Sequence, residues 1–297
     1  MEPAALYNEI LSGKPASIAV TDRTLWKATG EDRVRYINGQ VTNDVASLTN
    51  GSAIYAALLT PKGRLVADLW IGATADALWI DGPTQEKEAV EARLRRFLAA
   101  DDVELERLDC WTLIRAFPAS PTFPLPPGAV ALHSVRFGLP GWDLWCPDTG
   151  ARQIGLPIPP ALLESFRLEA GLPRWDAELH PGDLPQEVGM DPIAICYSKG
   201  CYVGQEIVSR LHHVGRPNRA LVLLAASPPS ADLAPNARLW LGEEEVGAIT
   251  SAAHSFARKG TIALGVVKRR ATAPGTRLRC DGYDLEVIEP LRPCHGR

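Results

Sequence analysis

The feature that most constrains the fold is the C-terminal part of the chain, which consists of short strand signals separated by turns. The signals follow one another from about residue 217 onward: ALVLLAA, ARLWL, EVGAITSA, TIALGVV and DLEVIE. Several short strands with regular turns are typical of a small antiparallel barrel. We therefore predict a barrel domain over residues 217–297, with the boundary near Arg216-Pro217.

The region before this boundary alternates strand and helix signals. A chain of 297 residues is long enough for roughly two or three domains. A helix is expected after Asp32, a hairpin at the turn Pro61-Lys62-Gly63, a charged helix over 84–99 and another helix over 160–170 that ends at Gly171. The fold class is therefore α+β.

The composition limits the compartment and the partners. The net charge of −4 disfavours a general nucleic-acid binder, so no stable direct nucleic-acid binding is expected. No apolar run approaches the roughly 20 residues that span a bilayer, and the first residues lack a secretory pattern. Six cysteines without a CxxC pair do not form a disulfide framework. We expect a cytoplasmic protein with free thiols and no membrane partner.

The stretch SKGCYVGQEIVSR carries the clearest chemical signal. Val203, Ile207 and Leu211 recur at helical spacing, so a helix is expected to begin near Cys201. A helix N-terminus is partially positive, and Lys199 adds a full charge two residues before the cysteine. Both effects favour a reactive thiolate, which makes Cys201 and Lys199 the candidate catalytic residues.

The alternative for any cysteine is a buried side chain that acts as a small hydrophobe. Cys110 and Cys146 lie in apolar strand patterns and are assigned that role. The charged, glycine-flanked surroundings of Cys201 indicate function instead.

The stretch KGCYVGQE, residues 199–206, resembles the signature of the YgfZ family, whose members are folate-binding proteins of the glycine-cleavage T-protein superfamily. Other stretches resemble the family in the same order along the chain: YINGQVTNDV at 36–45, LTPKGR at 59–64, RLEAG at 167–171 and PQE at 185–187. The resemblance covers about residues 16 to 290.

The resemblance implies a T-protein-like fold in which two interleaved α/β subdomains over residues 1–216 precede the barrel. It also implies a central channel that holds tetrahydrofolate or a derivative. Family members support iron–sulfur cluster assembly or repair and the tRNA modification that depends on it. The expected partners are therefore folate and iron–sulfur proteins or their assembly factors.

The same resemblance assigns the cofactor site. Glu169, in RLEAG, would bind the pterin ring, whose amino and ring N–H groups suit a carboxylate. Arg219 would lie near the folate tail, where a guanidinium suits a glutamyl carboxylate. Asp68 lies where T-proteins carry two adjacent aspartates, with Ala67 in place of its neighbour. Gln205 completes the expected site.

The sequence leaves the activity open. One alternative is a folate-dependent aminomethyltransferase, which the single aspartate and the added cysteine disfavour. The other is a non-catalytic scaffold for cluster-assembly partners. If the chain is an enzyme, it is a folate-dependent one-carbon or aminomethyl transferase.

A stable metal site is not expected, because Cys196 and Cys201, with Cys280, Cys294 and His295 far along the chain, form no ligand pattern. Walker, dinucleotide and serine-hydrolase motifs are absent from the sequence.

Overall fold

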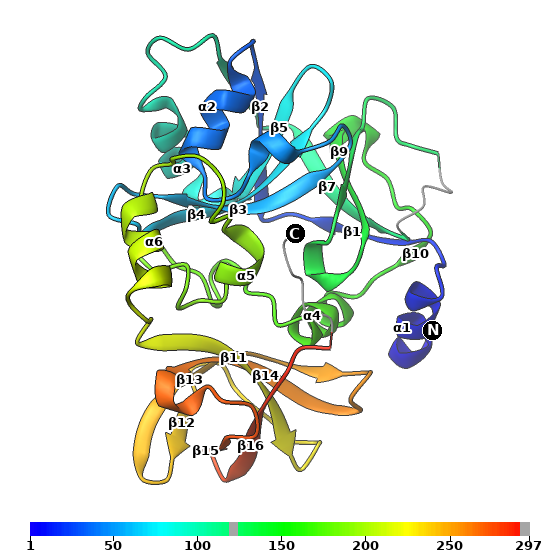
Figure 1. Ribbon diagram of the computed structural model, residues 1–297. Helices are drawn as coiled ribbons and strands as arrows, with labels where there is room; N and C mark the ends of the chain where they lie inside the picture. Colours follow the sequence, from blue (N-terminus) through cyan, green and yellow to red (C-terminus); the bar gives the residue numbers. More distant parts are fainter. Residues whose placement is uncertain (119–123, 292–297) are drawn as a thin grey trace.

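The computed structural model describes residues 1–118 and 124–291 of the chain. These residues form two five-stranded sheets and a closed six-stranded barrel. Figure 1 shows the sheets at one end and the barrel at the other, with three helices at the level between them: α4 (Pro160–Glu169), α5 (Asp191–Ala194) and α6 (Gln205–His213).

The first sheet is antiparallel and has the strand order β3-β4-β5-β2-β6. Two helices cover it, because their apolar residues recur at helical spacing. Ile37 of α2 and Leu94 of α3 are buried against Leu58 and Ile80 of the sheet. The elements are β2 (Arg23–Thr29), α2 (Arg33–Gln40), β3 (Ala53–Leu59), β4 (Leu65–Ala73), β5 (Leu78–Pro83), α3 (Lys87–Arg95) and β6 (Glu104–Leu108).

The second sheet has the order β10-β1-β7-β9-β8, and only the β10-β1 pair is parallel. Tyr7 of α1 and Phe166 of α4 stack and pack against Phe117 of β7. The elements are α1 (Pro3–Leu11), β1 (Ala16–Val20), β7 (Trp111–Phe117), β8 (Val130–Ser134), β9 (Gly141–Pro147) and β10 (Leu156–Pro157).

The two sheets are interleaved along the chain. Strands β1 and β2 are consecutive but belong to different sheets, as do β6 and β7. A shared apolar cluster joins the sheets: Leu25 and Trp79 from the first contact Leu113, Leu132 and Trp145 from the second. Residues that are far apart in sequence are therefore brought to the junction between the sheets.

The barrel prediction is confirmed. The strand order is β11-β14-β13-β12-β15-β16, and the barrel core includes Leu224, Ile249 and Leu278. Leu168 of α4 packs against Leu223 and Leu264, which fixes the barrel to the rest of the molecule. The strands are β11 (Arg219–Ser227), β12 (Arg238–Leu241), β13 (Glu244–Ser255), β14 (Gly260–Lys268), β15 (Arg277–Cys280) and β16 (Tyr283–Ile288).

Several local expectations differ from the structure. The charged helix is shorter than the predicted 84–99, because its first residues form a 3-10 turn and α3 ends at Arg95. Elements α1, β6, β10 and α5 were not predicted. The short 3-10 turns are η1 (Val45–Ser47), η2 (Thr84–Glu86), η3 (Arg136–Gly138), η4 (Asp148–Gly150) and η5 (Arg269–Ala271).

Across the two described ranges, none of the helices is both long enough and apolar enough to cross a membrane. Cys294 and His295 lie outside the described residues.

Candidate functional site

The cysteine-bearing segment lies against the end of α2. The Cys196 N–H donates to the Thr42 carbonyl (3.0 Å). The Val203 N–H donates to the Gly39 carbonyl (3.1 Å). The Thr42 hydroxyl donates in turn to the Ala194 carbonyl (2.6 Å). Two stretches that resemble family motifs, 36–45 and 199–206, are therefore direct neighbours in space.

Lys199 anchors this contact. Its Nζ donates to the carbonyls of Asn38 (2.7 Å), Val41 (2.9 Å) and Asn43 (2.6 Å). Asn38 lies in the last turn of α2, where carbonyls have no partner within the helix and a cation is favourable. Because all three ammonium protons are donated to carbonyls, Lys199 holds the segment in place. The structure therefore gives Lys199 an anchoring contact, and the activation of Cys201 by its charge stays a prediction.

The anchoring lysine makes stability depend on pH. Burial lowers the pKa of Lys199 to about 8, whereas a lysine in an unfolded chain titrates near about 10.4. Between these values the unfolded chain binds more protons than the folded chain, so the contribution of this group to stability rises with pH. We therefore expect the difference in free energy of unfolding, wild type minus Lys199→Met, to increase as pH rises from 7 to 9.5.

Urea unfolding of both proteins at the two pH values measures this gain. Lys268→Met is the control, because Lys268 is 51% exposed and pairs with Glu244 at the surface. A wild-type advantage that stays constant or shrinks with rising pH contradicts the lowered pKa of the buried lysine.

Cys201 is an exposed free thiol. The helix expected to start near it begins at Gln205 instead, because Gly204 adopts φ +90° and ends the preceding turn. The charge effect of a helix end fades within its first turn. Cys201 therefore stands before the helix, in an accessible loop and not at its N-terminus.

Cys196 is the cysteine whose charge acts on Lys199. Its backbone N–H binds the Thr42 carbonyl, and Lys199 binds the carbonyls on either side of Thr42. After burial and Asp44, Cys196 is among the charges that act on the pKa of Lys199. Its side chain is partly exposed, and its Sγ lies 3.4 Å from the Ser198 hydroxyl.

A third motif meets the same segment at two glycines. A Cβ at Gly204 would lie 2.8 Å from the Thr60 carbonyl oxygen, and a Cβ at Gly63 would lie 2.9 Å from Cβ of Ile207. Both glycines also have positive φ, which other residues adopt rarely. The 59–64 turn and the start of α6 are thus in contact through glycine backbone.

The remaining cysteines and Gln205 occupy separate places. Gln205 is the first residue of α6 and does not line the cavity described below. Cys146 is buried, as expected, and burial raises its pKa to about 11. Cys110 is exposed, in contrast to the expected buried role, because it lies in the turn between β6 and β7.

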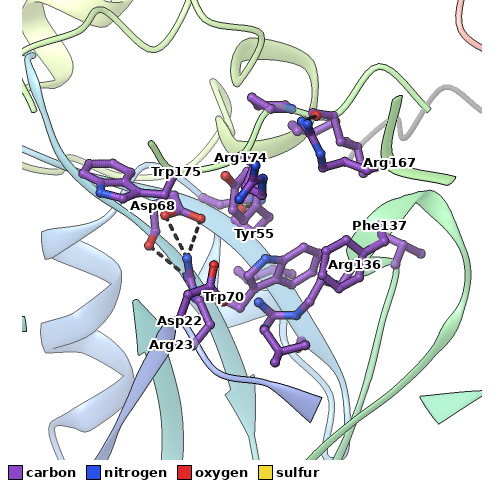
Figure 2. Close-up of a pocket in the computed structure, with 18 residues that line it drawn as sticks. Asp22, Arg23, Tyr55, Asp68, Trp70, Arg136, Phe137, Arg167, Arg174 and Trp175 are labelled. Atoms are coloured by element: carbon purple, nitrogen blue, oxygen red, sulfur yellow. Dashed lines mark hydrogen bonds and ion pairs between the residues drawn. The ribbon is translucent and has the colours of Figure 1, made fainter. Parts of the chain in front are cut away.

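A cavity of about 270 Å³ opens at the junction of the two sheets. Figure 2 draws the residues that line it and labels ten of them, with Asp68 and Arg23 joined by dashed lines. The lining comes from both sheets, from α4 and the segment after it, and from α5: Val20, Asp22, Arg23, Asn43, Ala53, Ile54, Tyr55, Asp68, Trp70, Val135, Arg136, Phe137, Arg167, Leu172, Pro173, Arg174, Trp175 and Ile193.

Asp68, one of the predicted site residues, lines this cavity and is bound by an arginine. The Arg23 Nη1 donates to both carboxylate oxygens of Asp68 (2.9 and 3.0 Å). The Arg23 Nε donates to Oδ1 of Asp81 (2.7 Å). Burial opposes the charge of Arg23, but the two carboxylates outweigh it and raise the pKa of Arg23 above its ordinary value.

The ion pairs continue into the second sheet. Arg136 donates to Asp81 (2.7 Å) and to Asp143 (2.9 Å), and Arg115 donates to Asp143 (3.0 Å). Although burial acts to raise the pKa of Asp143, the charges of Arg136 and Arg115 lower it. All these side chains are 7% exposed or less. Their charges alternate and cancel, which is the condition under which ions tolerate burial.

One wall of the cavity is aromatic. The rings of Tyr55 and Trp70 lie 5.0 Å apart, and the Arg136 guanidinium lies 4.8 Å from the centre of the Trp70 ring. Burial first, and then the charge and hydrogen bond of Asp68, raise the pKa of Tyr55 well above its ordinary value. A flat heterocycle that carries N–H groups fits a site with aromatic faces and a carboxylate.

Helix α4 presents Arg167 to the cavity and Glu169 to the opposite side, because residues two apart on a helix face away from each other. The Glu169 carboxylate is fully buried and accepts hydrogen bonds from the hydroxyls of Tyr7 and Ser255, at 2.7 Å each. This placement differs from the expected one, in which Glu169 faces the ligand. The network instead joins α1, α4 and the barrel.

Arg219 also lies apart from the cavity. It starts β11, its side chain is 54% exposed, and its Nη2 donates to Glu187 (3.1 Å). The exposed arginine that does line the cavity is Arg174, whose guanidinium Nε lies 3.5 Å from the Glu164 carboxylate. Arg174 is therefore the most exposed of the cavity arginines.

Sequence reasoning missed the four arginines of the cavity. Arg167 could have been predicted, because it is the first residue of the RLEAG stretch that also contains Glu169. Arg23 and Arg136 had no local signal: their partners Asp68 and Asp81 lie 45 and 55 residues away.

The cavity and the thiol segment share a wall. Asn43 lines the cavity while its backbone carbonyl accepts from Lys199. Ile193 of α5 also lines the cavity, three residues before Cys196. Within residues 1–118 and 124–291, no three His, Cys, Asp or Glu side chains come together in a way that would hold a metal ion.

The barrel matches a known domain model. Residues 219–286 match the glycine cleavage T-protein C-terminal barrel domain. The aminomethyltransferase T of the glycine cleavage system from Bartonella henselae has a similar crystal structure, with a TM-score of 0.79 over 98% of this chain and 90% of that one. The identity is 18%, so this likeness establishes the fold alone.

Sequence relatives extend over most of the chain. The tRNA-modifying protein YgfZ of Pectobacterium carotovorum is 28% identical over 93% of this chain and 91% of its own length. The YgfZ protein of Shigella boydii is 27% identical over 92% of both chains. The mitochondrial iron–sulfur cluster assembly factor IBA57 homolog of Mycosarcoma maydis is 25% identical over 78% of this chain and 67% of its own.

Proposed function

We propose that this chain, which is a YgfZ-type protein with the fold of the glycine-cleavage T-proteins, binds tetrahydrofolate or a derivative in the cavity beside Asp68. We further propose that it supports the assembly or repair of iron–sulfur proteins through the exposed thiol of Cys201. The observation that carries the proposal is the shared wall: Asn43 lines the cavity and also holds the anchor of the thiol segment.

The cavity suits the pterin end of a reduced folate. A carboxylate has about four acceptor positions, and Arg23 uses two of those of Asp68. Tyr55 also hydrogen-bonds to Asp68, and the position that remains can accept an N–H group from a pterin edge. Tyr55 and Trp70 supply aromatic surface beside it, and such surface binds flat rings well.

The arginines of the cavity suit the acidic, glutamyl end of the folate. Arg23, Arg136 and Arg167 each pair with buried carboxylates. Arg174 is 44% exposed, with only a long contact to Glu164, so its guanidinium has donors to offer. A guanidinium binds a carboxylate through two parallel hydrogen bonds. We assign Arg174 to the glutamyl end of the folate.

The role in iron–sulfur maintenance rests on the relatives and on the exposed thiol. The relative from Mycosarcoma maydis is named as an iron–sulfur cluster assembly factor, and the YgfZ relatives are named as tRNA-modifying proteins. Thiolates are the protein groups that engage iron–sulfur clusters most readily. Cys201 is exposed to a client protein, and Lys199, two residues before it, binds the carbonyl of the cavity residue Asn43.

The contacts of Asp68 favour folate binding without aminomethyl transfer. Both of its oxygens are engaged by Arg23, and Ala67 occupies the neighbouring position. Turnover of an aminomethyl donor to methylenetetrahydrofolate by the purified protein would instead make the chain a transferase.

Calorimetric titration with tetrahydrofolate under anaerobic conditions tests the folate site. Asp68→Asn removes the charge that faces the cavity, so we expect binding at least about tenfold weaker, the effect of one charged hydrogen bond. Asp143→Asn is the matched control: it breaks the same chain of ion pairs but does not line the cavity. Equal loss in both variants, or no binding by the wild type, refutes the assignment.

A further inference from the structure

A cluster of basic side chains forms one exposed face at the C-terminal end of α6. Arg210 lies in the last turn of this helix, and its carbonyl accepts from Val214 and Gly215. Arg216 and Arg219 follow on the segment that enters the barrel, and both are exposed. The cluster therefore begins on the helix and continues onto β11.

The barrel adds a second run of cations to the same face. Arg219 of β11 lies directly opposite Lys268 of β14 in the antiparallel ladder. The Arg269 N–H donates to the Asn218 carbonyl (2.9 Å). Arg269 and Arg270 of η5 are exposed beside it. Figure 1 shows the lower end of α6 and the orange turn at the end of β14 on the same side of the molecule.

The carboxylates nearby leave several of these cations without a partner. Glu187 pairs with Arg219, and Glu244 pairs with both Lys268 and Arg270. No ion pair with Arg210, Arg216 or Arg269 is found among the described residues. In a chain whose net charge is −4, this face is a local exception.

We propose that this face, Arg210, Arg216, Arg219, Lys268, Arg269 and Arg270, binds the phosphate backbone of a structured RNA. Protein–protein interfaces have an apolar core. Among the described residues of this face, Val214 is the only large apolar side chain that is exposed. Nucleic-acid interfaces are more polar and strongly positive. Arginine, which dominates the cluster, binds phosphate through its planar fork.

The position of the face is compatible with the thiol site. Helix α6 connects them: the basic cluster lies at its C-terminal end, and Cys201 precedes its first residue by four positions. A helix of this length spans about 13 Å. RNA bound at the cluster would therefore lie within reach of the cysteine-bearing loop.

The test is fluorescence anisotropy of labelled bulk tRNA with the full chain at 50 and 200 mM salt. Arg216→Glu/Arg269→Glu is expected to weaken binding at least tenfold and to reduce the salt dependence of the wild type, because fewer counterions are released. The control is Arg96→Glu/Arg152→Glu, which makes the same charge change on exposed arginines outside the barrel.

Three results would overturn the proposal: no tRNA binding at 50 mM salt, equal weakening by the control pair, or displacement of tRNA by an equal charge of polyglutamate. The last would assign the face to an acidic protein. Because folate titration is independent of these measurements, failure here leaves the folate proposal untouched.

Discussion

Replacing Arg136 with methionine is expected to lower the free energy of unfolding by about 3–5 kcal/mol, the cost of removing one partner from a buried ion pair. Arg136 joins Asp81 to Asp143, and its side chain is 6% exposed. Its loss leaves three carboxylates facing two arginines in the same buried chain of ion pairs. It also removes the cation that covers Trp70, so tryptophan fluorescence during urea unfolding is a suitable measurement.

Two variants separate the charge effect from general damage. Arg238→Met removes an exposed partner of Glu245 and is expected to cost less than about 1 kcal/mol. Adding Asp81→Asn to Arg136→Met restores the balance of charge and is expected to recover part of the lost stability. If Arg136→Met costs no more than the surface control, the alternating ions do not hold the two sheets together.

Local patterns were sufficient for the regular parts of the fold. The hairpin around Gly63 and the helix that ends at Gly171 follow from turn and capping signals, and both glycines have positive φ in the structure. The barrel followed from the spacing of its strand signals. These features depend on neighbours in sequence, so the sequence displays them directly.

The site depends on contacts that the sequence does not display. Helical spacing in α6 was recognised, but its start was misplaced, because the left-handed Gly204 interrupts the chain after Cys201. Lys199 was assigned to the cysteine two residues away, whereas its partners are carbonyls 156 to 161 residues distant. Glu169 and Arg167 could be separated only by knowing which face of α4 meets the sheets.

Cys201→Ala is expected to remove all function of this chain in the cell. In a bacterial strain that lacks its own YgfZ-type protein, the wild-type chain should restore the activity of an iron–sulfur enzyme, and Cys201→Ala should leave it at the level of the empty vector. The physical reason is that an exposed sulfur is the group available to a cluster or client protein, and alanine keeps the loop while removing that atom.

Two other cysteines make the result specific. Cys110→Ala removes an exposed thiol on a distant turn and should retain wild-type activity. Cys196→Ala removes the thiol that acts on the Lys199 charge and should retain most of the activity, because the lysine binds carbonyls and not sulfur. With equal protein levels by immunoblot, full activity of Cys201→Ala would refute the thiol role. If only Cys196→Ala lost activity, the reactive thiol would be that of Cys196, whose charge acts on Lys199.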